Sequence, residues 1–277
     1  MGQEQIGRTL LIIGLIVIGE WSHLVQSVTT EQDLTLTAKE KRALDQLKER
    51  VAPIVPHEYM KQDIYLIRWL RARNLDVNQA ETMLLENLKW RKENRMDNIL
   101  NEDFSELDRD YPFQIQYEDK EGKPIVTANF GDWDIRKLAI SGKISSLNRH
   151  IDRGFEMVTD KVRKLQESGK VVAQWDFIIN MENYKLSTAG LLTMSSYVPV
   201  SVNTYENHFP AHADKIMLIN TPAIFELVLN IIRPIMSPLT RQTLKVYNTN
   251  KEQWQKELFE IVDRNELPPE YGGTREV

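Results

Sequence analysis

The spacing of hydrophobic residues changes near residue 110. Before that point, apolar residues recur every three or four positions, as they do in amphipathic helices. We expect one helix to begin at the capping box formed by Thr37 and Glu40, a second at Asp63, and a third over residues 77–94, capped by Asp76. The pattern predicts a helical bundle over residues 31–105.

After residue 110, short apolar strands alternate with helices. The segment 114–130 reads as two strands around a Lys-Glu-Gly turn, and further strands are expected within 171–182, 215–220 and 244–248. Amphipathic segments between and after them predict helices, the longest over 143–168. Such alternation is typical of an α/β fold in which helices cover a mostly parallel sheet, here over residues 106–277.

One predicted helix is apolar on most of its surface. Between Pro222 and Pro234 its polar residues are Glu226, Asn230 and Arg233, whose spacing places them in one narrow stripe. All other positions are apolar, yet the segment is too short to span a bilayer, which takes about 20 residues. The pattern therefore indicates a helix with two apolar sides, of which packing against the core would bury only one.

Composition and motifs argue against several functions. A net charge of -5 disfavours nucleic-acid binding, and the absence of cysteine excludes disulfides and thiolate chemistry. The sequence has no glycine-rich phosphate loop and no nucleophile elbow. Pro210 lies between His208 and His212 and disrupts the helical spacing that would direct both at one metal ion. Together with the missing motifs, this leads us to expect no metal, no cofactor and no enzymatic activity. The basic residues at positions 68–95 are expected to form a solvated helix face.

The N-terminus has the layout of a secretory signal peptide. Arg8 precedes an uncharged apolar run at residues 9–19, and small polar residues follow it. We therefore expect residues 1–27 to be a signal peptide, with an uncleaved membrane anchor as the alternative. The expected location is the secretory pathway or the cell exterior.

Three segments together resemble the CRAL-TRIO lipid-binding family, especially its tocopherol- and retinoid-binding members. They are residues 63–94, residues 208–248 and the motif ELPPEYGG at 266–273. The resemblance runs from about 37 to 275. It implies a hydrophobic cavity between the sheet and a gate helix that swings outward at a membrane. The apolar helix described above matches the gate, at Ala223, Phe225, Val228 and Ile231.

The resemblance also implies a ligand and its contacts. Headgroup positions of phospholipid-binding members match apolar or uncharged residues here, and only Arg73 retains a matching arginine. We therefore expect a carrier of one hydrophobic small molecule that resembles a tocopherol, retinoid, carotenoid or sterol, with transient membrane contact. The alternative is a phosphatidylinositol or phospholipid binding or transfer protein, and a lipid-modifying enzyme is the least favoured reading. The expected ligand-binding residues are Trp175, Phe177, Ile179, Met181, Tyr197, Tyr205, Phe209, Ile216 and Leu218; Glu182, Tyr197, Thr204 and Tyr205 are candidates for a polar anchor.

Overall fold

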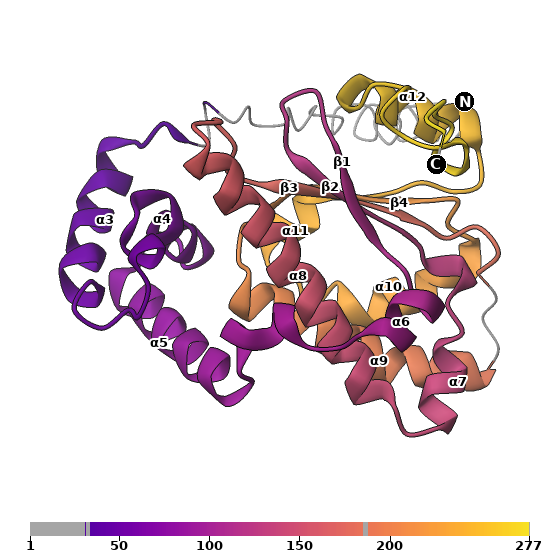
Figure 1. Ribbon diagram of the computed structural model, residues 1–277, viewed down its shortest axis with the longest axis horizontal. Coiled ribbons are helices and arrows are strands. Elements are labelled where there is room, and N and C mark those ends of the chain that lie inside the picture. The colour runs from indigo at the N-terminus through magenta and orange to yellow at the C-terminus, as the bar shows by residue number, and fades with distance from the viewer. Residues whose placement is uncertain (1–30, 32–33, 185–187, 277) are drawn as a thin grey trace, which may run out of the picture.

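The computed structural model describes residue 31, residues 34–184 and residues 188–276, and side chains within 188–196 are outside this description. The chain forms a helical lobe followed by a larger α/β domain (Figure 1). This arrangement confirms the predicted fold class.

The helical lobe contains α3 (Ala38–Val51), α4 (Asp63–Ala72) and α5 (Val77–Glu93), with a short 3₁₀ helix, Glu58–Lys61, between the first two. Apolar side chains from all three helices form one core, in which Leu44, Leu66 and Leu84 are fully buried. A second 3₁₀ helix, Met96–Asn101, and α6 (Ser105–Asp110) lead from the lobe to the sheet.

All three predicted helix starts are confirmed, and so are two of the three predicted caps. Thr37 and Glu40 form the reciprocal capping box, and the Asp76 carboxylate accepts a hydrogen bond from the backbone N–H of Gln79. Asp63 does not cap its helix. It lies inside the first turn and instead accepts a hydrogen bond from Lys48 Nζ at 2.6 Å, which ties α4 to α3.

The five strands lie in sequence order across one sheet. They are β1 (Gln114–Glu118), β2 (Pro124–Asn129), β3 (Trp175–Asn180), β4 (Ala213–Ile219) and β5 (Leu244–Val246). β1 pairs with β2 antiparallel through a turn at Gly122, whose φ of 78° suits glycine. The other three pairings are parallel.

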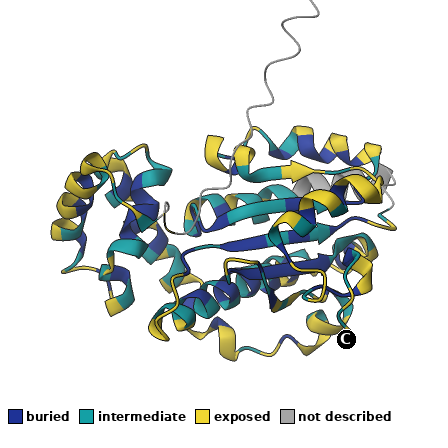
Figure 2. Ribbon diagram, turned by 90° about the horizontal axis from the view of Figure 1, so that it is seen from above, coloured by how far each residue is buried: buried dark blue, intermediate teal, exposed yellow. Residues whose placement is uncertain are grey.

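Helices cover both faces of the sheet (Figures 1 and 2). α12 (Lys251–Ile261) and the C-terminal segment with its 3₁₀ helix Pro269–Tyr271 pack on one face, where Ile178, Met217 and Trp254 are buried together. The opposite face meets the remaining helices of the α/β domain. These are α7 (Ile135–Ile140), α8 (Ile144–Glu167), α9 (Thr188–His208), α10 (Glu226–Ile232) with its preceding 3₁₀ turn Ala223–Phe225, and α11 (Pro238–Thr243); a further 3₁₀ turn, Phe130–Asp132, follows β2.

Three asparagines join the carboxyl ends of the parallel strands. Asn180 Oδ1 accepts a hydrogen bond from Asn220 Nδ2 at 2.9 Å, and Asn180 Nδ2 donates to Asn129 Oδ1 at 3.3 Å. Trp254 Nε1 donates to Asn220 Oδ1 at 3.0 Å and so connects α12 to the same network. Because Asn180 and Asn220 are buried and hydrogen-bonded, the network fixes the edge of the sheet from which the apolar helix departs.

Buried arginines attach the helical lobe to the α/β domain. Arg68 is buried and donates to the carbonyl oxygens of Ala173 and Ala211. Arg91 Nη1 lies 2.8 Å from Glu156 Oε2 on α8, a carboxylate that is also buried. The prediction of a fully solvated basic face is therefore wrong at these two positions, because their guanidinium groups have partners on the other domain.

Asp176 is a buried acid on β3. Its Oδ1 accepts the Lys215 backbone N–H at 3.0 Å, whereas its Oδ2 has no hydrogen-bond partner in the described structure. Burial raises the pKa of Asp176 to about 8, against the opposing effect of the Lys215 ammonium. Folding therefore favours the protonated acid, and stability from this group is complete below the unfolded pKa, near 4, and is lost as the pH rises toward 8.

We expect Asp176→Asn to flatten this part of the stability profile. The amide keeps an acceptor for the Lys215 N–H but cannot ionise. As the pH rises from 5 to 9, wild type should lose free energy of unfolding relative to the variant by on the order of 1–3 kcal/mol. Urea unfolding of both proteins at pH 5 and pH 9 measures this difference. An equal change in the free energy of unfolding with pH for the two proteins would contradict the raised pKa of Asp176.

Candidate functional site

The sheet face under α8, α9 and α10 is incompletely buried in its middle. Trp175 and Met181 at the two ends of β3 are buried, but Phe177 and Ile179 between them are only half-buried. On the opposite face of the same strand, Ile178 is fully buried. A central parallel strand covered by helices would ordinarily be sealed on both faces, so this side is packed less completely than is usual for such a strand.

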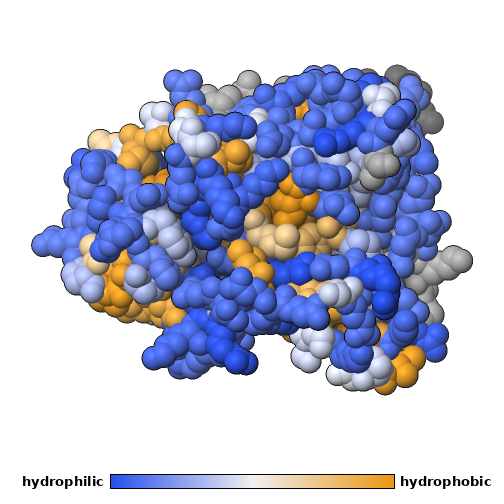
Figure 3. Space-filling view, in the orientation of Figure 1, coloured by the Kyte–Doolittle hydropathy of each residue, from blue (hydrophilic) through white to orange (hydrophobic). Residues whose placement is uncertain are grey.

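The adjacent strand continues this half-buried surface. The register pairs Phe177 with Ile216 and Ile179 with Leu218, and both β4 residues are half-buried too. Four apolar side chains thus form a contiguous patch on two central strands. On the face seen in Figure 3, hydrophobic residues gather in a hollow near the middle of the molecule, bordered by hydrophilic ones.

An aromatic cluster closes one end of the patch. The ring of Trp175 lies 4.7 Å from that of Phe177 and 5.9 Å from that of Tyr205, and Phe155 on α8 lies 5.2 Å from Phe209. The Tyr205 hydroxyl accepts the Ala213 backbone N–H at 3.0 Å. The structure therefore brings these predicted residues together, with Tyr205 held by the backbone of β4.

The apolar helix closes the other end. Phe225 and Val228 are buried in one cluster with Met181 and Tyr197, and Ile179 and Leu218 pack against that cluster. The remaining predicted gate residues lie elsewhere on the segment: Ile231 is half-buried and Ala223 is exposed. The predicted wall and the inner side of the predicted gate are therefore in contact.

The outer side of the same helix is also apolar. Ile224 and Leu227 each expose 45% of their surface. The polar residues Glu226 and Arg233 of the same segment form an ion pair with each other. The helix therefore has an apolar inner face and an apolar outer face, as the sequence indicated.

Rigid elements hold both ends of this helix. Asn220, part of the asparagine network, adopts a left-handed conformation with φ of 52° and precedes Pro222. At the far end the helix stops before Pro234, and the Ser237 hydroxyl caps α11 by accepting the Thr240 N–H at 3.2 Å. The helix is thus a short segment between two fixed points.

The candidate polar anchors have different surroundings. Glu182 is exposed and lies 3.1 Å from Lys251 Nζ, so it faces away from the patch. Thr204 is half-buried on α9, and Tyr197 is buried beside the apolar helix. Arg73 ends α4 in the helical lobe, where its Nη1 donates to the Ala72 carbonyl at 3.2 Å, and its headgroup contact stays a prediction.

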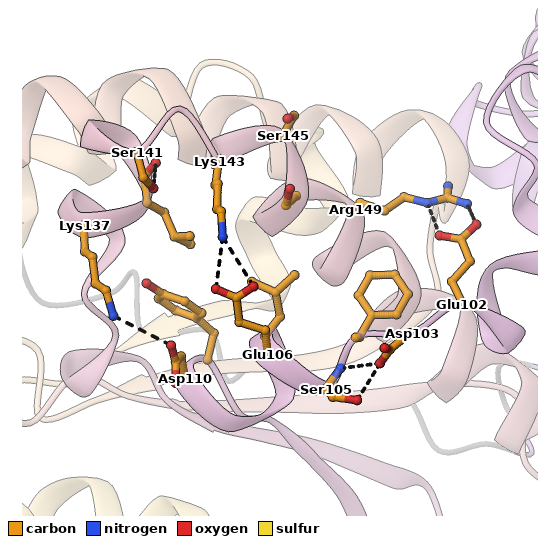
Figure 4. A pocket seen from close by; sticks show the side chains of 15 residues that line it. Glu102, Asp103, Ser105, Glu106, Asp110, Lys137, Ser141, Lys143, Ser145 and Arg149 are labelled. Atoms are coloured by element: carbon orange, nitrogen blue, oxygen red, sulfur yellow. Dashed lines mark hydrogen bonds and ion pairs between the residues drawn. The ribbon is translucent and has the colours of Figure 1, made fainter.

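A second, polar groove lies between α6 and the α7–α8 segment (Figure 4). It has a volume of about 620 Å³, and each of its three lining cations faces an acid. The nitrogen–oxygen distances of these ion pairs are 2.6 Å for Arg149–Glu102, 3.1 Å for Lys143–Glu106 and 3.8 Å for Lys137–Asp110. Because its lining carries charged side chains, the groove does not suit an apolar chain. Because each cation is paired with an acid, the groove attracts anions only weakly. In the sequence, this groove is indicated only by the acidic residues within 102–110, which the sequence analysis did not assign to any site.

Comparison with known proteins identifies the family. The model of the CRAL/TRIO domain matches residues 108–273. The chain belongs to this family. Its members bind and transfer lipids, so the coarse prediction of a lipid-binding protein is confirmed.

Individual relatives extend the match to the helical lobe. The chain is 27% identical over 252 residues to the SEC14 cytosolic factor of Eremothecium gossypii, covering 87% of this chain and 79% of that protein. It is 26% identical over 215 residues to Protein real-time of Drosophila pseudoobscura pseudoobscura, covering 75% of this chain but only 31% of that longer protein. The crystal structure of Sfh5 superposes with a TM-score of 0.63 at 15% identity, covering 87% of this chain and 88% of that one, which shows a shared fold.

The comparisons contradict the expected secretion. The fungal relative that matches most of the chain is named a cytosolic factor, and no comparison supports a secreted or membrane-anchored protein. Arg8, the apolar run at residues 9–19 and the small polar residues after it suggested a signal peptide, but Glu4 offsets Arg8 and the cleavage site is not clear. That segment lies outside the described residues. Within the described ranges, no helix combines the length and apolarity needed to cross a bilayer.

The described residues also contain no group of three or more histidine, cysteine, aspartate or glutamate side chains arranged to hold a metal ion. His212 belongs to the segment in which two histidines lie close together in the sequence. It is buried, its Nδ1 lies 2.9 Å from the Pro210 carbonyl oxygen, and burial lowers the pKa of its imidazole to about 3.

Proposed function

We propose that the protein carries one lipid molecule between the sheet and the α9–α10 layer and exchanges it at membranes. The observation that carries this proposal is the half-buried apolar patch of Phe177, Ile179, Ile216 and Leu218 on two central strands. Residues 106–277 form the lipid-binding domain in this proposal, and residues 31–105 form the helical region that precedes it.

We infer that the cargo is a phospholipid. The SEC14 relatives favour this class, which was the alternative prediction, over a tocopherol- or retinoid-like molecule. Burial of about fifteen methylenes contributes on the order of 12 kcal/mol before the costs of association, whichever lipid supplies them. The apolar patch therefore suits an acyl chain as well as a smaller hydrophobic ligand, and no chemical step is required.

The apolar helix is the gate in this proposal. Its inner residues Phe225 and Val228 cover the patch, and its outer residues Ile224 and Leu227 contact the bilayer when the protein docks. When the helix moves, Phe225 and Val228 lose their apolar contacts with the patch. Burial of Ile224 and Leu227 in the membrane offsets this loss, because both are exposed to water beforehand.

We expect Leu227→Asp to slow lipid transfer between vesicles at least several-fold while the protein stays folded. Leu227 exposes 45% of its surface, so an aspartate there costs little stability but resists insertion into a bilayer. Val228 is unsuitable for this test, because it is fully buried and an aspartate there would disrupt the core. Leu100→Asp is the matched control, since Leu100 is 42% exposed and lies outside the apolar helix, on the 3₁₀ helix Met96–Asn101. Equal transfer rates for both variants and wild type would count against the gate.

We expect Leu218→Trp to reduce the amount of bound lipid, because the larger side chain fills the space beside the patch. Mass spectrometry of lipid extracted from the purified protein measures the occupancy and names the lipid class. Val171→Trp, at a position 64% exposed, controls for the added indole. Full occupancy in Leu218→Trp would refute this site, and a tocopherol-, retinoid- or sterol-like molecule as the main bound species would refute the phospholipid assignment.

A further inference from the structure

A small pocket lies where the apolar helix leaves the sheet. It has a volume of about 220 Å³ and is bordered by residues from both sides of that junction. Thr221, Glu226 and Leu229 border it from the segment after β4, Tyr247 and Asn248 from the segment after β5, and Gln253 from α12. The four residues of the apolar patch are not among the described residues that border it, so this pocket is separate from the proposed lipid site.

One wall of the pocket is tied to the sheet. The Thr221 N–H donates to the Tyr247 carbonyl oxygen at 2.9 Å, and the Tyr247 N–H donates to the Leu218 carbonyl oxygen on β4 at 2.8 Å. The other wall is the apolar helix, which contributes Glu226. The pocket therefore lies between the helix proposed as the gate and the strands from which it would move.

Thr221 is the buried polar residue of this pocket. Only 6% of its surface is exposed, and its Oγ1 has no hydrogen-bond partner within the part of the chain that the structure describes. Buried hydroxyl groups in folded proteins nearly always have a partner. A buried hydroxyl without one, on a residue that borders a pocket, therefore points to a ligand that binds there.

The side chains around the pocket indicate the charge of that ligand. Glu226 is the only charged residue among the described residues that border it. The side chains of Thr221, Asn248 and Gln253 each offer an oxygen that accepts hydrogen bonds, as the Glu226 carboxylate does. An anion would be repelled by the carboxylate, whereas an ammonium group would be attracted by it and can donate to every one of these oxygens. Leu229 adds apolar surface for the carbon atoms of such a ligand.

The present partner of Glu226 does not connect the helix to the sheet. Glu226 pairs with Arg233 of the same segment, and the two side chains are 52% and 41% exposed. Ion pairs as exposed as this one contribute little to stability. A carboxylate has several acceptor sites, so a cation in the pocket can bind Glu226 beside or in place of Arg233. Such a cation would link Glu226 to Thr221 and thereby to the sheet.

Resting on the proposed function, we propose that this pocket binds a small organic ammonium ion, which holds the gate helix against the sheet and slows lipid exchange. Glu226 binds the ion from the helix, and Thr221 binds it from the side of the sheet. The ammonium group can belong to a free amine in solution or to the headgroup of a lipid in the membrane.

Titration of the full chain with choline, in solution and without lipid, tests the pocket. Neohexyl alcohol is the matched control, because it has the shape of choline but carbon in place of the charged nitrogen. Calorimetry measures both affinities. We expect choline to bind about tenfold more tightly than the alcohol, or more, because only choline attracts the carboxylate.

Two variants and one control locate the bound ion. Glu226→Gln should weaken choline binding by about tenfold or more, and Thr221→Val by about five- to tenfold, the loss of roughly one hydrogen bond. Thr221→Val keeps the shape of the side chain and removes a hydroxyl without a partner in the described structure, so the fold should survive. Glu252→Gln removes an exposed carboxylate next to Gln253, on a residue that does not border the pocket, and should leave the affinity unchanged.

Lipid transfer between vesicles tests the effect on the gate. We expect choline to slow transfer between phosphatidylglycerol vesicles several-fold relative to sodium at equal ionic strength, and Glu226→Gln to abolish this effect. Slowing that occurs only with phosphatidylcholine vesicles, and that Glu226→Gln abolishes, would assign the ammonium group to a lipid headgroup instead of a free amine.

Different results would overturn different parts of the proposal. The ammonium site is wrong if neither soluble choline nor phosphatidylcholine vesicles produce an effect that depends on Glu226, or if choline and neohexyl alcohol bind equally. Choline that binds at Glu226 while transfer proceeds at an unchanged rate would overturn the effect on the gate. A chain that binds choline but transfers no lipid from either kind of vesicle would instead refute the proposed function.

Discussion

A parallel sheet needs cover on both faces, and this protein meets that requirement unequally. The alternation of side chains along β3 sends Ile178 to one face and Phe177 and Ile179 to the other. α12 seals the first face completely, with Trp254 joined to the asparagine network. The second face is covered by helices that leave its centre half-buried. The same strands therefore pack more completely on one side than on the other, and the proposed lipid site lies on the less complete side.

The apolar helix makes sense only in this setting. Its leucine and isoleucine on the outer side form an exposed apolar surface that a helix on a fully packed core would not need. Its phenylalanine on the inner side packs on the half-buried face of the sheet. Asn220 and Pro222 fix where it leaves the sheet, and Pro234 fixes where it ends. In the proposed gate, movement of this segment would therefore leave the strands that form the wall undisturbed.

Periodicity predicted most of the fold because the hydrophobic pattern is set by the sheet and by helix faces. It failed where one residue's partner is remote in sequence. Arg68 and Arg91 looked like part of a solvated face, but their partners lie more than sixty residues away. The polar groove arises from residues 102–110 and 137–149, which only the fold brings together. The predicted secretion was wrong for a different reason: a short apolar run after one arginine does not by itself distinguish an export signal from other N-terminal segments.

The ligand class was hard to predict for a related physical reason. Contacts with a hydrocarbon chain contribute about 0.8 kcal/mol for each buried methylene, and this contribution hardly differs between a sterol, a tocopherol and an acyl chain. The residues that dominate the sequence pattern, such as Phe177 and Leu218, therefore provide affinity with little selectivity. Selection between lipids has to come from a few polar contacts, each of about 0.5–1.5 kcal/mol when made but more costly when a buried group is left without a partner. In such a site, discrimination depends less on attraction of the correct lipid than on the unsatisfied oxygens that an incorrect lipid leaves behind.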